Sequence, residues 1–317
     1  MRRSRASRYD ADVGAWPLVL VLLGGCGRIG FDAFADRGPD AGAIDGAGGD
    51  AAPLGPFSSA VDVLELNQGA VNSEDPSLTD DLLEVVFSST RPGGVGGVDV
   101  WTSTRASIGG GWAVPVLAAA INTASDDTTP EISGDGLTLV VASNRPGGSG
   151  LYDLYVATRA SRGTSWSAPA RITELASSAD AFSGPLAPDR RWMVFASSRT
   201  GGVGAGDIYE TTRSSSTDSW NAPTTVSIDS TVDDSAPWLS ADGRTLYFGS
   251  TRAGGQGMQD IWIAIRPTPA DAWTPPGVVS ELSSADNDSD PWLSPDQRTI
   301  FFSRQAGSMR NIFMATR

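Results

Sequence analysis

The chain has 317 residues, a formal net charge of −14 at neutral pH, one cysteine and no histidine. This acidic balance disfavours nucleic acid and anionic lipid as main partners. The lack of histidine excludes a Ser-His-Asp triad, a histidine-ligated metal and imidazole acid–base catalysis. The single cysteine excludes an internal disulfide and a cysteine-based metal site.

Residues 1–25 have the pattern of a signal peptide. Four of the first eight residues are arginines, and an apolar run follows over residues 16–23, too short for a bilayer-spanning helix. The small residues Gly24 and Gly25 before Cys26 resemble a bacterial lipobox, which implies cleavage before Cys26 and lipidation of its thiol. Gly27 replaces the aspartate that retains many lipoproteins at the inner membrane, so we expect an outer-membrane lipoprotein, on the periplasmic side or the cell surface. The alternative is an ordinary signal peptide that happens to contain a cysteine.

Residues 26–56 are predicted to be a disordered tether behind the lipidated cysteine. Glycine, alanine and aspartate follow one another closely from Asp40 to Asp50, and such a segment buries too little apolar surface to offset its conformational entropy.

Residues 57–317 consist of five copies of one segment, with a period of 52–55 residues. Each copy begins at a proline, passes through a strand and a Gly-rich loop to an aspartate (asparagine in the fifth), and enters a second strand. The prolines are Pro76, Pro130, Pro185, Pro237 and Pro291. The first four copies continue through Trp112, Trp166, Trp220 and Trp273.

The fifth copy has no such continuation, whereas an unmatched segment, 57–64, precedes the first copy and has Phe57 in the tryptophan position. A ring explains both ends, because the N-terminal strand can complete the last blade and remove exposed sheet edges. The sequence therefore predicts an all-β, five-bladed β-propeller of four-stranded blades over residues 57–317.

The repeats resemble the WD40-like, Pro-Asp type of propeller repeat known from the C-terminal domain of TolB. The resemblance rests on turns such as Ser240-Ala241-Asp242-Gly243 and Ser294-Pro295-Asp296, followed by Ser-x-Arg-x-Gly-Gly and Asp-Ile-Tyr. It implies the propeller fold. TolB propellers usually have six blades behind another domain, so a TolB role is not expected here.

An arginine stands eight residues before an aspartate in four repeats. A hairpin would bring each pair together across the base of the loop, so we predict four structural ion pairs. They are Arg91–Asp99, Arg145–Asp153, Arg199–Asp207 and Arg252–Asp260.

The connections between blades are rich in aspartate and should share a face with the Gly-rich loops. Candidate binding residues there are Asp126, Asp127, Asp233, Asp234, Asp286 and Asp288. They could bind Ca²⁺, but no spacing matches a known calcium loop, so ordinary solvated turn aspartates are the favoured interpretation. Trp238 and Trp292 could stack on a sugar, or could be buried between blades.

Two function classes remain open. The favoured one is a non-catalytic, monomeric module that binds an envelope protein or glycan, needs no cofactor, and touches the membrane only through its lipid. The alternative is a glycoside hydrolase with carboxylates at the channel mouth. Glu131 is a weak catalytic candidate, since it replaces Ser77, Leu186, Trp238 and Trp292 of the other repeats.

Overall fold

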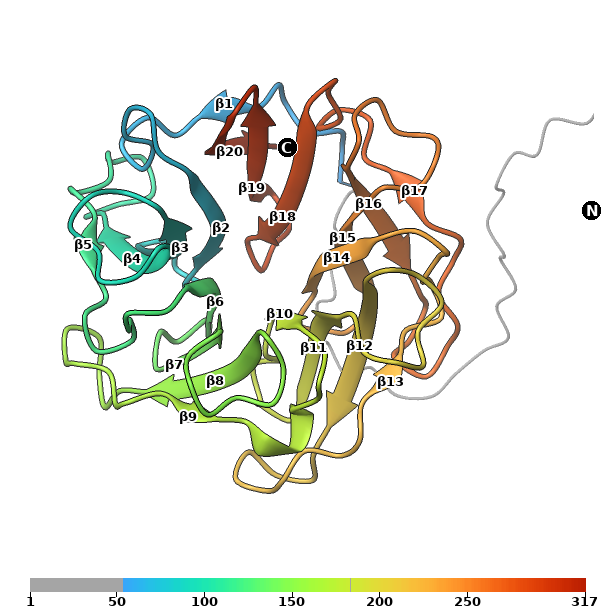
Figure 1. Cartoon of the computed structure of the whole chain (residues 1–317). Coiled ribbons are helices and arrows are strands. Elements are labelled where there is room, and N and C mark those ends of the chain that lie inside the picture. The colour runs from blue at the N-terminus through green and yellow to red at the C-terminus, as the bar shows by residue number, and fades with distance from the viewer. Residues whose placement is uncertain (1–53, 183) are drawn as a thin grey trace, which may run out of the picture. The chain divides into compact units, whose positions relative to one another are not determined.

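A computed structural model describes residues 54–182 and 184–317, which form five four-stranded antiparallel sheets around a common axis (Figure 1). The predicted five-bladed, all-β propeller is confirmed. The only helical element in the described residues is a 3-10 turn at Thr173–Leu175. The predicted signal peptide, Cys26 and almost all of the predicted tether lie outside the described residues.

Each blade starts with an inner strand at the axis and ends with an outer strand of two residues. From the axis outward the strands are β2 (Ser73–Leu78), β3 (Glu84–Ser89), β4 (Asp99–Thr104) and β5 (Val116–Leu117) in blade 1; β6 (Asp127–Ile132), β7 (Thr138–Ser143), β8 (Asp153–Thr158) and β9 (Ala170–Arg171) in blade 2; β10 (Ala181–Phe182), β11 (Trp192–Ser197), β12 (Asp207–Thr212) and β13 (Thr224–Thr225) in blade 3; β14 (Asp234–Leu239), β15 (Thr245–Ser250), β16 (Asp260–Ile265) and β17 (Gly277–Val278) in blade 4; and β18 (Asn287–Leu293), β19 (Thr299–Ala306), β20 (Met309–Thr316) and β1 (Val61–Asp62) in blade 5.

The ring is closed by the N-terminal strand, as the truncated fifth repeat predicted. Strand β1 pairs antiparallel with β20, with Val61 opposite Met314. The backbone N–H of Ser58 also donates to the carbonyl of Thr316 at 2.7 Å. Blade 5 is therefore built from both ends of the described chain.

An arginine after the third strand of each blade stacks on the aromatic residue that precedes the outer strand. The guanidinium-to-ring distances are 4.0–4.4 Å for Arg105 on Trp112, Arg159 on Trp166, Arg213 on Trp220, Arg266 on Trp273 and Arg317 on Phe57. The five-fold recurrence explains the repeated tryptophans, which pack under a cation that holds the outer segment to the blade. It also confirms that Phe57 takes the tryptophan position.

The predicted arginine–aspartate pairs do not form, because both members have other partners. Arg145 reaches back to Asp127 at 2.6 Å, at the start of the inner strand, and Arg252 pairs with Asp234 at 2.6 Å. Arg304 pairs with Asp288 in the same way in blade 5. This third pair was not predicted, because the loop of blade 5 is shorter. Asp127, Asp234 and Asp288 are fully buried, so they hold the blades and are not free to bind a ligand.

The aspartates of the predicted pairs instead cap the Gly-rich loops. Asp99 accepts a hydrogen bond from the backbone N–H of Val95 at 3.1 Å, and Asp207 accepts one from Val203 at 3.0 Å. A Cβ at Gly94 would lie 1.9 Å from the Asp99 carboxylate. The loop therefore folds over the carboxylate and leaves the arginine no access to it.

The inner strands of four blades carry a β-bulge immediately before the repeat proline. The bulged residues Asp75, Thr129, Ala236 and Asp290 have φ values of 44–55°. Such bulges commonly re-aim side chains beside functional sites. In blade 3, β10 is only two residues long, and the strand predicted from Pro185 is reduced to one bridge between Leu186 and Met193.

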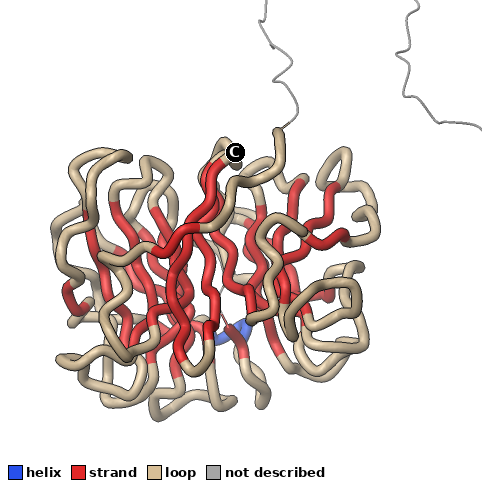
Figure 2. The backbone as a smooth tube through the Cα atoms, turned by 90° about the horizontal axis from the view of Figure 1, so that it is seen from above, coloured by secondary structure: helices blue, strands red, loops and turns tan. Residues whose placement is uncertain are grey.

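The strands run between two faces of loops (Figure 2). We call the face with the Gly-rich loops, which join the second and third strands, the glycine face, and the other the hairpin face. The predicted placement of the blade connections on the glycine face is confirmed, because the N–H of Val98 donates to Asp126 at 3.0 Å. No helix in the described part of the chain has the length and apolar character to cross a bilayer.

Candidate functional site

A cavity of about 370 Å³ lies at the propeller axis and opens on the glycine face. We call it the axial pocket. Loop residues Ala205, Gly206 and Gln259 contribute to its rim. Its wall contains six carboxylates and a single cationic residue, Arg310. The carboxylates are those of Glu74, Asp75, Glu131, Asp180, Asp233 and Asp290.

Three of these carboxylates gather around Arg310 where blades 1 and 5 meet. Nη1 of Arg310 lies 3.0 Å from Oε2 of Glu74 and 3.7 Å from Oδ2 of Asp290. Burial raises the pKa of Glu74, and Arg310 only partly opposes this. Burial, followed by the charges of Asp290 and Glu74, raises the pKa of Asp75 well above its ordinary range. The single guanidinium of Arg310 therefore does not offset the charges of these three carboxylates.

Asp75 also links neighbouring blades. Its Oδ2 accepts hydrogen bonds from the hydroxyl of Thr128 at 3.2 Å and the N–H of Thr129 at 3.3 Å, while its own N–H donates to Ser303 at 3.0 Å. The bulge thus fixes the Asp75 carboxyl in the wall between blades 1 and 2.

Glu131 lies at the waist of the channel and lines both the axial pocket and a cavity of about 200 Å³ that opens on the hairpin face. The hydroxyl of Ser77 donates to its Oε2 at 2.9 Å. Burial raises the pKa of Glu131 to about 8; the Ser77 bond opposes this shift and the charge of Asp290 adds to it. Glu131 is therefore mostly protonated at neutral pH.

The two predicted tryptophans line the cavity on the hairpin face but are buried, with 6% of Trp238 and 5% of Trp292 exposed. Trp238 packs edge-on against Tyr247, and Trp292 against Phe301. Of the two readings for these residues, burial is the one found, and neither offers an open stacking platform.

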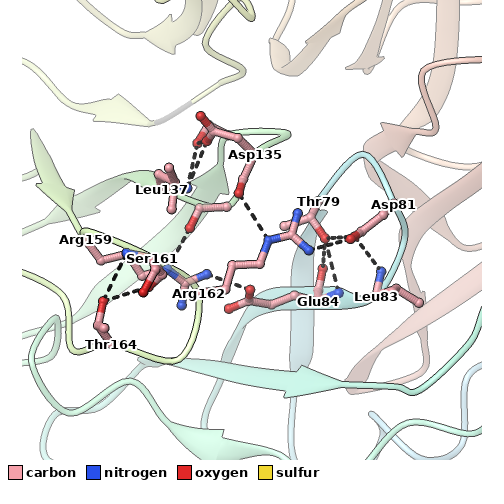
Figure 3. Close-up of polar contacts among 12 residues, drawn as sticks. Thr79, Asp81, Leu83, Glu84, Asp135, Leu137, Arg159, Ser161, Arg162 and Thr164 are labelled. Atoms are coloured by element: carbon pink, nitrogen blue, oxygen red, sulfur yellow. Dashed lines mark hydrogen bonds and ion pairs between the residues drawn. The ribbon is translucent and has the colours of Figure 1, made fainter.

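Two carboxylates of the hairpin face, those of Glu84 and Asp81, pair with arginines (Figure 3). Arg159 pairs with the buried Glu84 at 2.6 Å, joining blades 1 and 2. Arg162 pairs with Asp81 at 2.5 Å and donates to the carbonyl of Asp135 at 3.1 Å. These contacts hold adjacent blades together.

The predicted aspartates of the blade connections separate into different roles. Only Asp233 lines the axial pocket, where burial raises its pKa. Asp126 accepts from the N–H of Val98 and from the hydroxyl of Tyr152, and its charge helps burial to raise the pKa of Tyr152 to about 12. Asp286 does not line the pocket. Among the described residues, no group of three or more acidic side chains is arranged to hold a metal ion.

Glu74, Asp75, Asp290 and Arg310 were not among the site residues predicted from the sequence. A signal was present, because Asp75 and Asp290 stand at the bulge position, where other repeats have Thr129, Gly184 and Ala236. Glu131 stands at the position after the proline, and the bulge separates that position from the one of Asp75 and Asp290.

No protein-family model and no curated protein matches the chain. Among solved structures, it is similar to the catalytic domain of the GH62 α-L-arabinofuranosidase of Coprinopsis cinerea, with a TM-score of 0.54 and 12% identity over 82% of this chain and 96% of that one. The endo-arabinase of Bacteroides thetaiotaomicron VPI-5482 gives a TM-score of 0.52 and 13% identity over 78% and 95%. The expected likeness to TolB is also found: the putative TolB of Agrobacterium tumefaciens gives 0.48 and 19% identity over 79% of each chain. At these identities the likeness shows a shared propeller fold alone.

Proposed function

We propose that this protein is a non-catalytic binding module of the bacterial cell envelope, which holds a protein or glycan ligand in the axial pocket. The imbalance of six carboxylates to one arginine in the pocket wall carries the proposal. In the repeat positions of blades 2, 4 and 5, each buried aspartate has its own arginine. A ligand that brings hydrogen-bond donors or positive charge would supply what the axial pocket lacks.

The hydrogen bonds of the pocket carboxyls favour recognition over turnover. Glycoside hydrolysis needs two carboxyls facing one bond, one protonated and one ionised. Asp75 is held by Thr128 and Thr129, Glu74 by Arg310, and Glu131 by Ser77. These groups are fixed in the wall, as suits a preformed binding site.

The envelope location rests on the N-terminal sequence. The apolar run of residues 16–23 and the lipobox-like residues before Cys26 support export and a lipid anchor, through which a monomeric propeller would be held at the outer membrane. Fractionation of a Cys26→Ser variant tests this part. The variant should leave the membrane fraction, and continued sedimentation with the membrane would contradict the anchor.

One observation favours glycoside hydrolysis as a second candidate. Glu131 has a pKa of about 8, so it could act as a general acid at neutral pH, and Asp290 is near enough to influence it electrostatically. Under this alternative Glu131 would protonate the leaving group and Asp290 would be the ionised partner.

A single set of assays separates the two candidates. The full chain is incubated with arabinan, arabinoxylan and soluble peptidoglycan fragments, with and without Ca²⁺, while binding and release of reducing ends are both recorded. We expect saturable binding without turnover, lost when Ala205→Trp fills the pocket rim and kept in Ala222→Trp, a matched change at an exposed outer position. Sustained hydrolysis abolished by Glu131→Gln would establish the enzyme instead, and binding that ignores Ala205→Trp would place the ligand elsewhere.

A further inference from the structure

Four of the five blades present an exposed apolar side chain from the Gly-rich loop. The exposed fractions are 56% for Val95, 72% for Leu151, 60% for Val203 and 75% for Met258. A single exposed apolar residue needs no explanation, but recurrence in the same loop of four blades distributes apolar groups around the glycine face. We call these four residues the apolar tips.

Hydrogen bonds and close packing hold the loops that carry the apolar tips. In blade 1 the carboxylate of Asp99 accepts the N–H of Val95 at 3.1 Å, and Asp153, Asp207 and Asp260 play the same part in the next three blades. A Cβ at Gly96 would lie 2.0 Å from the carbonyl oxygen of Ser125 in the next blade connection, so the loop rests directly on its neighbour. Rigid loops lose little conformational entropy when a partner binds, which suits a preformed contact surface.

Blade 5 interrupts this arrangement. Its second and third strands are joined by a tight turn at Gly307, and it carries Arg310 into the pocket in place of an apolar tip. Residues Ala205, Gly206 and Gln259 of the Gly-rich loops form part of the pocket rim, so the tips and the pocket belong to one face.

We infer that the apolar tips and the axial pocket together dock a polypeptide segment in which an arginine or lysine stands between apolar residues. The inference rests on the proposed binding function and specifies the class of ligand. The cationic side chain would enter the pocket, where one arginine faces six carboxylates, and the apolar neighbours would rest on the tips. An anionic lipid surface does not fit this charge, and a second copy of the chain would bring its own negative charge, −14 overall.

The test uses a synthetic, fluorescein-labelled pentapeptide with a central arginine flanked by leucine and valine on each side. Two matched peptides replace the arginine with glutamine, or the four apolar residues with serine. Affinities for the full chain are measured by fluorescence anisotropy at low and high salt. We expect each replacement to weaken binding at least about tenfold, and salt to weaken only the arginine-containing peptides.

Protein variants then locate the contact. A variant with Val95, Leu151, Val203 and Met258 all changed to serine should bind the arginine peptide at least about tenfold more weakly while melting like the parent, because these side chains are exposed. The matched control is Ile108→Ser with Val114→Ser. These residues are 61% and 77% exposed in the loop between the third and fourth strands, which lies on the hairpin face, and their replacement should leave affinity unchanged.

Three results would overturn the inference. They are equal affinities for the three peptides, equal effects of the tip and control variants, and tip-dependent binding to zwitterionic or anionic lipid vesicles without peptide binding. No peptide binding, together with glycan binding sensitive to Ala205→Trp, would reject the polypeptide partner while leaving the proposed binding function intact.

Discussion

The buried aspartates of the repeat and the carboxyls of the axial pocket stand close together in the chain but differ in their cationic partners. Asp288 is fully buried and pairs with its own arginine, Arg304. Asp290, two residues later, lies 3.7 Å from Arg310, which also pairs with Glu74. Asp75 in blade 1 forms no ion pair with an arginine of the described residues, and burial, with the charges of Asp290 and Glu74, raises its pKa well above the ordinary range. Between these neighbouring acids, the one with its own guanidinium holds the fold, and those without one line the axial pocket.

The same comparison extends to blade 1, where the arginine is present and the acid is missing. Arg91 is buried, but Ser73 occupies the position of Asp127, Asp234 and Asp288. Nη1 of Arg91 has no hydrogen-bond partner among the described residues, and burial lowers the pKa of Arg91 to about 10. The propeller therefore contains both kinds of incomplete pair. Arg91 in blade 1 lacks an aspartate, and carboxylates of the axial pocket lack an arginine.

The largest effect is expected from removing the segment that completes the ring. Deletion of residues 57–66 removes strand β1 and the carbonyl of Leu66 that accepts from Arg91 at 2.7 Å. We expect the melting temperature to fall by roughly 10 °C or more, since each kcal/mol moves a domain of this size by about 2–4 °C. Deletion of 27–50 is the control and should leave melting unchanged. Equal melting of both deletions and the parent would disprove closure by β1.

Removing one repeat carboxylate should be the next most damaging change. Asp234→Ala leaves Arg252 without its ion-pair partner, and breaking a buried pair costs about 3–5 kcal/mol of unfolding free energy. Chemical denaturation would measure the loss. Asp286→Ala, which breaks no ion pair, should behave like the parent, and Asp234→Leu combined with Arg252→Met should recover much of the stability. A small effect of Asp234→Ala would show that the paired acids are not the structural set.

Replacing a carboxylate of the axial pocket by its amide should raise the stability instead of lowering it. The folded chain holds the Asp75 proton more tightly than the unfolded chain, so stability contributed by the protonated form is lost as pH rises above the ordinary value of 3.8 through the raised pKa. Asp75→Asn stays neutral and keeps an acceptor for Thr128. We expect a gain of about 1–3 kcal/mol that is larger at pH 8 than at pH 5. A gain independent of pH would show that the Asp75 charge is not the cause.

The smallest effect is expected from completing the pair in blade 1. Ser73→Asp offers Arg91 the carboxylate that the arginines of blades 2, 4 and 5 already have, and we expect about 1 kcal/mol of added stability. The matched control is Ser165→Asp at an exposed position, which should change stability little. Destabilisation by Ser73→Asp would mean that the repeat position alone does not make the pair favourable.

The sequence predicted the fold well because its signals are periodic. Five prolines, four tryptophans and Phe57 recur at fixed positions, and strand β1, which lies in the segment with Phe57 in the tryptophan position, completes blade 5 as predicted. The predicted loop pairs were wrong because sequence spacing does not give side-chain direction. Asp99 is enclosed by its own loop, whereas Arg145 extends back to Asp127.

The candidate site was only partly predictable for a related reason. Glu131 was identified because it interrupts a regular position. Asp75 and Asp290 were not, because a bulge before each proline places them in the pocket wall. The excess of carboxylates over Arg310 arises where blades 1 and 5 meet, and only closure of the ring brings these two blades together. Contacts between the two ends of a chain are not visible in a single repeat.

Direct titration of Glu131 tests the central claim that the pocket carboxyls lack cationic compensation. The chain contains seven glutamates, so selective carbon-13 labelling of their carboxyl groups gives few NMR signals, and a Glu131→Gln variant assigns the one of interest. We expect the Glu131 signal to titrate near pH 8, because burial against Ser77 is not offset by a guanidinium. A midpoint near the ordinary value of 4.5 would contradict the account, since it would mean that solvent or an arginine already compensates the pocket.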